Sequence, residues 1–245
     1  MTHLLRPLIR LWPMIATIVL LSLPCTVLAG GKATIITASQ PMQPGRHSKS
    51  GASETMTVTW RDANTLRMDM GDQASYLIMR DGKAYSVTQA GGQVRVMDMS
   101  AMMKMMQSMG GQGAKSKSKN PFGRIESIEA TGATDTVAGV TGRVYQMRWT
   151  EGDGRQKSGE AVLTDDPLVV EMTRAYLGSM SAMIGADNTQ SFEKSLPDDE
   201  RGMLRMGDQF RIDSISRSDP PASTFTLPAE PMDLQSLMGG MGQKQ

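Results

Sequence analysis

The chain has 245 residues and a formal net charge of only +1 at pH 7, because 26 Lys and Arg oppose 25 Asp and Glu. This balance, without a basic face, excludes the electrostatic signature of a nucleic-acid-binding protein. The length allows one large domain or two small ones around a continuous core, and we favour one.

The N-terminal segment has the three parts of a secretory signal peptide. Arg6 and Arg10 precede an apolar run over residues 14–23, and Val27 and Ala29 stand three residues and one residue before a cleavage site after Ala29. The apolar run is too short to span a bilayer comfortably. We therefore expect residues 1–29 to be removed and the mature protein to be periplasmic.

The only cysteine, Cys25, lies inside this leader. Lipoprotein processing needs a small residue directly before the cysteine, where this chain has Pro24, so lipid anchoring is not expected. The mature chain then has no thiol, which excludes disulfides, thiolate metal sites and cysteine nucleophiles. Stability has to come from a packed core.

Apolar and polar residues alternate between residues 53 and 96, and turn residues recur at short intervals. This pattern is typical of an antiparallel meander of half-buried strands. It predicts strands near residues 55–60, 66–70, 76–79, 83–87 and 94–96. Asp81-Gly82 stands between two of them and is a strong signal for a two-residue type I′ hairpin turn.

The second half has the same style, with one change of period. Further strands are predicted near residues 125–128, 144–149, 160–164, 210–215 and 224–227. Between them Met172, Tyr176, Met180 and Met183 recur at spacings of four and three, which predicts a helix over residues 171–184. The expected fold class is therefore mainly β (α+β), with two or three helices.

The chain contains 23 methionines, and six of them fall between residues 99 and 109. On a helix these six occupy one arc of roughly 160°. Asp98 or Ser100 can cap the start of this helix, and Gly110-Gly111 can end it. A helix of about three turns is marginal alone, so it has to pack its apolar face on something. The six candidate ligand-binding residues are Met99, Met102, Met103, Met105, Met106 and Met109.

Three uses of this methionine face are open. It can pack on the protein's own sheet, it can adapt to acyl chains or apolar partners because thioether side chains are flexible, or its sulfurs can ligate Cu(I). A second segment that begins at Met232 repeats the apolar spacing of the segment that begins at Met97, and Gly239-Gly240 ends it. We expect no resident cofactor or metal.

Signals of catalysis are weak. The sequence has no Gly-rich phosphate loop and no zinc spacing, and His47 is the only histidine after the leader. Asp165-Asp166 before Pro167 is interpreted as a turn, and residues 198–200 (Asp-Asp-Glu) as a solvated face or a helix start. We expect a protein that is not an enzyme.

Four short motifs carry a resemblance to a known family. They are Asp81–Tyr85 in a hairpin, Val94–Met99 leading into the methionine-rich helix, Thr136–Gly139 ahead of Val144-Tyr145, and Phe225–Pro228. Over roughly residues 50–228 the chain resembles an exported bacterial domain family of unknown function that is related in fold to the LolA/LolB lipoprotein carriers. Many members have a cysteine soon after the Val-Ala-Gly element, where this chain has Val140–Arg143.

The resemblance implies a curved antiparallel sheet, a half-barrel whose concave face is covered by helices and, in the carriers, holds acyl chains. The expected organisation is a leader (1–29), a single LolA-like β domain (30–228) with a flexible insertion (110–120), and a Met- and Gly-rich C-terminal tail (229–245). We expect a monomeric periplasmic binding protein for a lipid, an acyl chain or an apolar partner segment. A copper-binding or oxidant-absorbing envelope protein is the alternative. A lipoprotein or envelope partner and a peripheral membrane contact fit these expectations.

Overall fold

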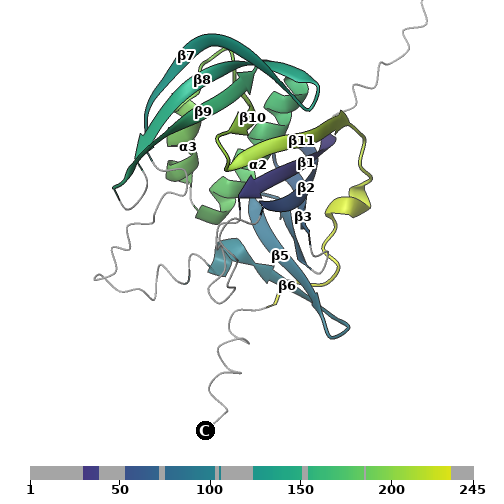
Figure 1. The fold of residues 1–245 in the computed structure, drawn as a ribbon. Coiled ribbons are helices and arrows are strands. Elements are labelled where there is room, and N and C mark those ends of the chain that lie inside the picture. Colours follow the sequence, from purple (N-terminus) through teal and green to yellow (C-terminus); the bar gives the residue numbers. More distant parts are fainter. Residues whose placement is uncertain are drawn as a thin grey trace, which may run out of the picture.

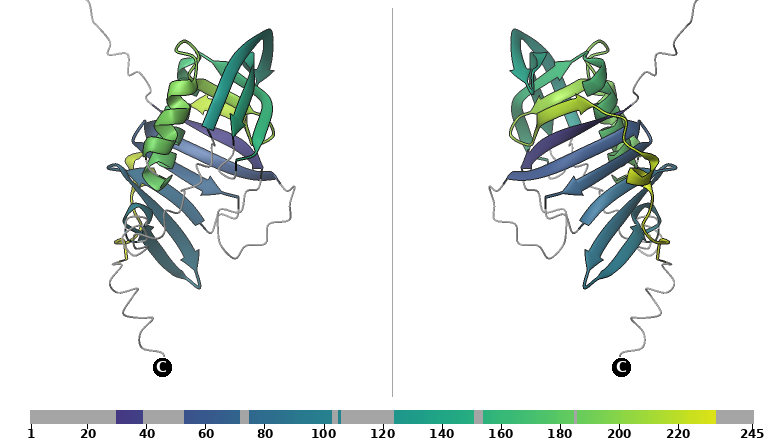
Figure 2. Two further views of the ribbon diagram at one scale, coloured as in Figure 1. Left: turned by 90° about the vertical axis from the view of Figure 1, so that its left-hand side faces the viewer. Right: turned by 90° about the vertical axis from the view of Figure 1, so that its right-hand side faces the viewer.

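The computed structural model of the protein describes residues 30–38, 53–71, 75–102, 105, 124–150, 154–184 and 186–232. Within these residues eleven strands form one antiparallel sheet, in the order β6-β5-β4-β3-β2-β1-β11-β10-β9-β8-β7. The sheet does not close, since β6 and β7 are its two edges. Figures 1 and 2 show that it curves around the helices. The predicted mainly β class with one antiparallel sheet is confirmed.

The first half of the chain forms a hairpin meander. Its strands are β1 (Gly31–Ala38), β2 (Ser53–Asp62), β3 (Thr65–Met70), β4 (Ser75–Arg80), β5 (Lys83–Ala90) and β6 (Gln93–Asp98). The five strands predicted between residues 53 and 96 are confirmed. So is the type I′ turn, because Asp81 has φ 54° and Gly82 has φ 70°.

The second half contributes the other five strands. They are β7 (Arg124–Val137), β8 (Val140–Thr150), β9 (Gln156–Thr164), β10 (Gly202–Met206) and β11 (Phe210–Arg217). β7 and β8 are longer than the apolar pattern predicted, and their hairpin turns on Ala138 (φ 52°) and Gly139 (φ 80°). β10 was not predicted.

The two halves join through β1, which the sequence pattern did not identify as a strand. β1 pairs with β2 on one side and with β11 on the other, from Gly31 opposite Arg217 to Thr37 opposite Phe210. This second pairing shifts register between Thr34 and Ile35. The first strand of the fold thus lies in the middle of the sheet.

Two helices separate β9 from β10, namely α2 (Pro167–Ile184) and α3 (Ala186–Ser195). Asp166 caps α2, because its Oδ1 accepts hydrogen bonds from the backbone N–H groups of Leu168 (2.9 Å) and Val169 (3.1 Å). Asp at the N-cap followed by Pro at the first helical position is a favoured helix start. The predicted turn at Asp165-Asp166 and the predicted helix start at residue 171 were therefore wrong.

The main core lies between the concave face of the sheet and the helices. Its central side chains are fully buried and come from β1, β2, β3, β10, β11 and α2; they include Ile35, Trp60, Leu66, Met172, Leu204 and Ile212. A smaller cluster of Ile78, Tyr85, Val87 and Val96 lies on the opposite face of the sheet, with Leu227 packed on it.

The predicted closing strand at residues 224–227 was wrong. This segment contains a short 3-10 helix, η1 (Ala222–Phe225), that lies against β3 and β4. Phe225 is buried, and the Arg61 guanidinium lies 5.0 Å from its ring centroid. Pro221 and Pro228 have no N–H to donate to a ladder, so this segment covers the sheet with side chains.

One acidic residue is also buried against expectation. Asp198 and Asp199 are exposed as predicted, but Glu200 is 5% exposed, and its Oε1 lies 2.9 Å from Arg143 Nε on β8. The pKa of the Arg143 guanidinium is raised, first by the charge of Glu200 and then by the Tyr145 hydroxyl. Glu200 thus holds the chain after α3 on β8.

Candidate functional site

Helix α2 closes one end of the concave face. The backbone N of Met203, at the start of β10, donates to Thr173 Oγ1 at 2.9 Å, and Gly178 lies so close to the β2–β3 turn that a Cβ there would be 3.0 Å from the Ala63 carbonyl oxygen. Near its last turn the Ala182 carbonyl accepts from Ser100, just after β6. α2 thus follows one set of strand ends from β10 to β6.

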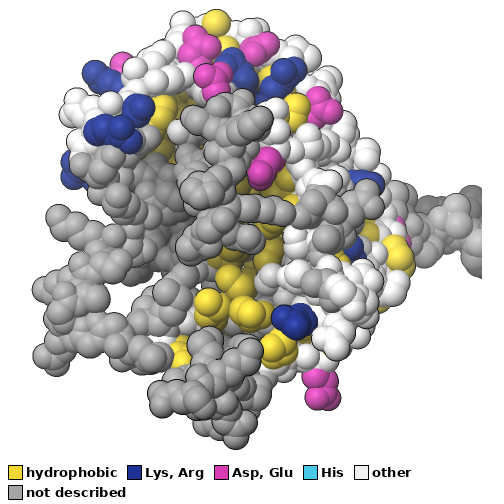
Figure 3. Space-filling view, turned by 60° about the horizontal axis from the view of Figure 1, so that its bottom comes forward, with side chains coloured by type: hydrophobic (Ala, Val, Ile, Leu, Met, Phe, Trp, Pro, Cys, Tyr) yellow, Lys and Arg dark blue, Asp and Glu magenta, His cyan; other side chains and the backbone are white. Residues whose placement is uncertain are grey.

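The other end of the concave face carries apolar side chains that are only half-buried. Met56 of β2 lies opposite Met70 of β3, and Ile125 of β7 lies opposite Trp149 of β8. These four and Met206 of β10 pack against the main core. We call these five the open-end apolar residues. In the strand order, β2 and β3 lie on one side of β1, and β7, β8 and β10 lie on the other. In the part of the chain that the structure describes, these five side chains stay partly exposed, at the strand ends opposite those that α2 follows. Figure 3 shows hydrophobic side chains gathered near the middle of one face of the molecule.

The methionine-rich helix begins where it was predicted to begin. Residues 99–102 and 105 are helical, and the Asp98 carboxylate caps the start by accepting from the Ala101 N–H at 2.9 Å. Ser100 has another role: its Oγ accepts from the Ala84 N–H at 3.1 Å and lies 3.4 Å from the Ala182 carbonyl. The start of this helix is therefore tied both to β5 and to the last turn of α2.

Of the six candidate methionines, the structure places three. Met99, Met102 and Met105 are helical and half-buried. At about 100° per residue they span one arc of roughly 120°. Met103, Met106 and Met109 lie outside the described residues. That the methionine face binds a ligand stays a prediction.

The second methionine segment starts beside the first. The Met232 N–H donates to the Val96 carbonyl at 2.8 Å, so the chain after η1 covers part of the β6 edge. Covering an edge strand prevents it from pairing with other chains. The rest of this segment, residues 233–245, lies outside the described residues, as do the leader (1–29) and the predicted insertion (110–120).

Tyr176 of α2 packs against the main core and brings a hydroxyl group to it. Its ring centroid lies 5.7 Å from that of Phe210, with the ring planes inclined at 51°. Burial raises the pKa of Tyr176 to about 12, because the phenolate is poorly solvated there. The side chain therefore stays a neutral hydrogen-bond donor across the physiological pH range.

We expect Tyr176 to make the protein less stable at alkaline pH. The unfolded chain releases this proton near pH 10 while the folded protein keeps it until about pH 12, so the free energy of unfolding falls between these values by up to about 2.7 kcal/mol. The burial of Tyr145 raises its pKa as well and acts in the same direction. Urea unfolding at a series of pH values measures this loss of stability, and in Tyr176→Phe most of the loss should disappear. If the variant loses stability as steeply with pH as the parent does, the ionisation of Tyr176 is not its cause.

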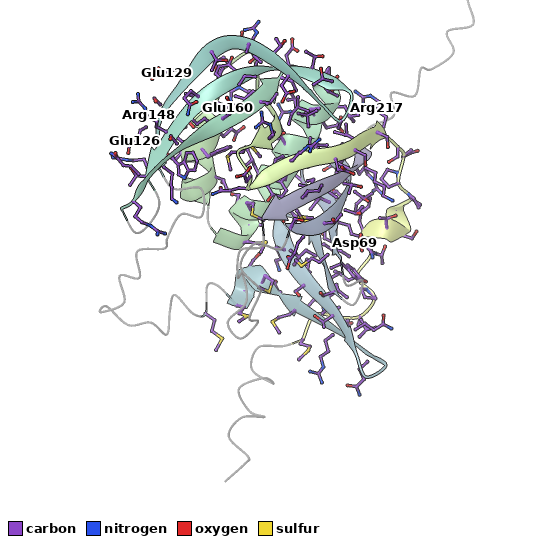
Figure 4. All side chains as sticks on the ribbon, viewed as in Figure 1. Asp69, Glu126, Glu129, Arg148, Glu160 and Arg217 are labelled. Carbon is purple, nitrogen blue, oxygen red and sulfur yellow. The ribbon has the colours of Figure 1, made fainter. Side chains whose placement is uncertain are left out.

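The opposite face of β7 and β8 is charged. The Arg148 guanidinium lies 3.0 Å from Glu129, and the Arg124 guanidinium lies 2.8 Å from Glu126. Arg148 directly precedes Trp149 in the chain, and Arg124 and Glu126 flank Ile125. Figure 4 labels Glu126, Glu129 and Arg148 of this group, and also Glu160, whose carboxylate is 3.5 Å from Arg205. Exposed pairs of this kind contribute little stability. The alternation keeps the charged side chains on one face and the apolar ones on the other.

Two further observations bear on the class of site. Among the residues that the structure describes, no group of three or more His, Cys, Asp or Glu side chains could hold a metal ion. In that same part of the chain no helix has both the length and the apolar character to cross a membrane. A site built from thioether sulfurs is a separate matter, since it uses none of these four residue types.

No protein-family model matches this chain, and no curated protein and no solved structure matches it either. The fold and the site together define a class of protein. Its members have an open, curved antiparallel sheet with helices on the concave face, and half-buried apolar side chains at one set of strand ends. Sequence reasoning missed the open-end apolar residues as a site. Their alternation indicated which face they share, but only the strand register shows that they lie away from α2.

Proposed function

We propose that this protein is an exported, non-enzymatic binding protein whose concave face takes up an apolar ligand, namely the acyl chain of a lipid or lipoprotein. One observation carries the proposal: the half-buried open-end apolar residues, contributed by strands from both sides of an unclosed sheet. The resemblance to the LolA/LolB carriers, in which the helix-covered face holds acyl chains, supports it. The signal-peptide pattern of residues 1–29 supports a periplasmic location.

The open-end apolar residues are costly to leave in contact with water. Removing apolar surface from water is favourable by about 25 cal/mol per Å² in free energy, so contact between these side chains and an acyl chain favours binding. Binding sites for such ligands are concave and mostly apolar, with a few polar groups that fix orientation. Tyr176 supplies one such group, because its neutral hydroxyl can donate to an ester or amide oxygen.

The experiment is native mass spectrometry of the mature protein purified from the periplasm, followed by removal of bound lipid and titration with a fluorescent fatty acid. We expect a co-purified lipid and saturable binding of the probe at a single site. Protein that carries no lipid and does not bind the probe would rule out this function.

A second candidate function is favoured by the arc that Met99, Met102 and Met105 share. Thioether sulfurs on one helix face can ligate Cu(I) or take up oxidant. In the same mass spectrum, a bound copper ion without lipid would favour this alternative.

Changing Met99, Met102 and Met105 together to leucine separates the two functions. Leucine nearly conserves volume and apolar area, so we expect the free energy of unfolding to change by less than about 1.5 kcal/mol per site and fatty-acid binding to persist. Cu(I) binding cannot persist, because leucine has no donor atom. Isothermal titration calorimetry measures the two affinities, one for the fatty acid and one for Cu(I). Met147→Leu is the control, because Met147 is 2% exposed in the core and should affect neither. Lost Cu(I) affinity with intact folding would move the assignment to the copper alternative.

A further inference from the structure

Gly30 is the residue that directly precedes β1, and it is buried. Its backbone nitrogen lies 2.9 Å from Glu171 Oε1 on α2 and donates a hydrogen bond to it. Its carbonyl accepts from the Ser218 N–H at 3.4 Å, just after β11. The start of the fold is thus enclosed between a helix and the end of a neighbouring strand.

Only glycine fits this place. A Cβ on residue 30 would lie 2.4 Å from the Trp60 carbonyl oxygen and 2.9 Å from the Arg61 Cα, both of which are backbone atoms. Gly31 is equally confined, with a Cβ position 2.5 Å from the Trp60 ring. The two residues that follow the expected cleavage site are therefore fitted to the interior of the fold, and the nitrogen of the first one faces a carboxylate.

We propose that Glu171 is the binding site for the α-ammonium group that signal-peptide cleavage creates on Gly30. A signal peptidase hydrolyses the Ala29–Gly30 peptide bond, and water provides the hydroxyl of the Ala29 carboxyl group and a hydrogen for the Gly30 amine. The Ala29 carboxyl loses its proton at neutral pH, and the amine takes one up to become an ammonium group. The nitrogen that donates to Glu171 as a neutral amide then donates as a cation. This inference rests on the export part of the proposed function.

The surroundings of Glu171 suit this role. Its side chain is 27% exposed, so water screens the new pair only in part. Its other carboxylate oxygen lies 3.7 Å from Arg217 Nη1. Arg61, whose backbone lies beside Gly30, has its guanidinium 5.0 Å from the Phe225 ring centroid. A charge-assisted hydrogen bond is shorter and stronger than a neutral one. Cleavage therefore strengthens the attachment of α2, the helix that closes one end of the concave face, to β1.

The pair has a defined dependence on pH. We expect contact with Glu171 to raise the pKa of the Gly30 ammonium above the ordinary α-amino range of about 7.7–8.0. The added stability is complete below the pKa that this group has in the unfolded chain. It is lost as the pH rises through the higher value of the folded protein.

The test is a double-mutant cycle on protein that is made to begin at Gly30 by cleaving a fusion in vitro, so that it does not depend on export. Four proteins are compared: free or acetylated at the Gly30 nitrogen, each with Glu171 or with Glu171→Gln. Acetylation keeps an N–H but removes the charge. We expect it to lower the folding equilibrium constant by about three- to tenfold beside Glu171, and by less than about twofold in Glu171→Gln. Urea unfolding measures these constants.

A second readout is the pKa of the Gly30 ammonium, measured by NMR of protein labelled with ¹⁵N at this position. It should be raised in the parent protein and lower in Glu171→Gln, whereas Glu193→Gln on α3, with the same change of charge, should leave it raised. Equal effects of acetylation in both backgrounds, or an ordinary pKa in the parent, would overturn the assignment. If Glu171→Gln fails to fold, the pKa of the Gly30 ammonium in the parent protein decides by itself whether the assignment holds. Periplasmic protein that starts at another residue would also overturn the assignment, because cleavage would then not create an ammonium group on Gly30.

Discussion

Replacing Trp60 with alanine is expected to lower the free energy of unfolding by about 3–5 kcal/mol, the range found when large aromatic side chains are removed from a packed core. Trp60 is 0% exposed and belongs to the main core. Its ring covers Gly31 of β1, at the centre of the sheet. Removing it leaves a cavity where the two halves of the chain meet. Equilibrium unfolding in urea measures the loss.

The matched control is Trp60→Phe. The indole N–H of Trp60 is buried without a hydrogen-bond partner in the described part of the protein, so phenylalanine removes an unpaired donor while it keeps an aromatic ring. We expect a much smaller loss of stability than for alanine. A loss below about 1 kcal/mol in Trp60→Ala would show that the β1–β2 junction is not the packed centre of the fold.

Replacing Trp149 with alanine is expected to act on binding more than on folding. Trp149 is half-buried at the open end, its ring lies over Gly159 of β9, and it faces Ile125 across the β7–β8 ladder. If it covers part of a bound acyl chain, its removal costs about 1.5–3 kcal/mol of binding free energy, a factor of roughly ten to a hundred in Kd. Titration with a fluorescent fatty acid measures this factor.

The neighbouring position provides a control for this prediction. Arg148 lies on the other face of β8, with its guanidinium 3.0 Å from Glu129 and 3.0 Å from Ser127 Oγ. Arg148→Ala should leave the affinity within about twofold of the parent, because exposed ion pairs contribute little and this face does not meet the ligand. Equal loss of affinity in both variants would place the ligand away from the concave face.

Local sequence patterns were sufficient for the meander from β2 to β6. Each of these strands pairs with its neighbour in the chain through a short turn, and the Asp81-Gly82 turn fixes the register of β4 and β5. Alternation within a strand shows which side chains share a face. The start of the methionine-rich helix was also predicted, with Asp98 or Ser100 as its cap, and the structure shows that Asp98 is the one, because its carboxylate accepts from the Ala101 N–H.

The errors have a common origin. β1 and β10 were both missed as strands. β10 is only five residues long and shows no clear alternation, whereas β1 alternates Lys32 and Thr34 with Ala33 and Ile35. Each takes its place in the sheet by pairing with a segment that lies far away in the chain, β1 with β11 and β10 with β9. The start of α2 was placed too late: Asp165-Asp166 before Pro167 was interpreted as a turn, whereas Asp166 caps the helix and Pro167 is its first residue. Phe225 and Leu227 were assigned to a strand for their apolar character, whereas in the structure Phe225 is buried and Leu227 packs against the cluster on the other face of the sheet, without joining a strand.

The sequence by itself determined the class of the fold, most of its local hairpins, the start of the methionine-rich helix and the pattern of an exported chain. These features depend on residues close together in the chain. Only the tertiary structure decided that β1 joins β11, that Trp60 is in the core while Trp149 is at the open end, and that Glu200 is buried on β8. Burial and strand pairing between distant segments depend on which surfaces meet after folding, and two tryptophans with the same local pattern therefore have different roles.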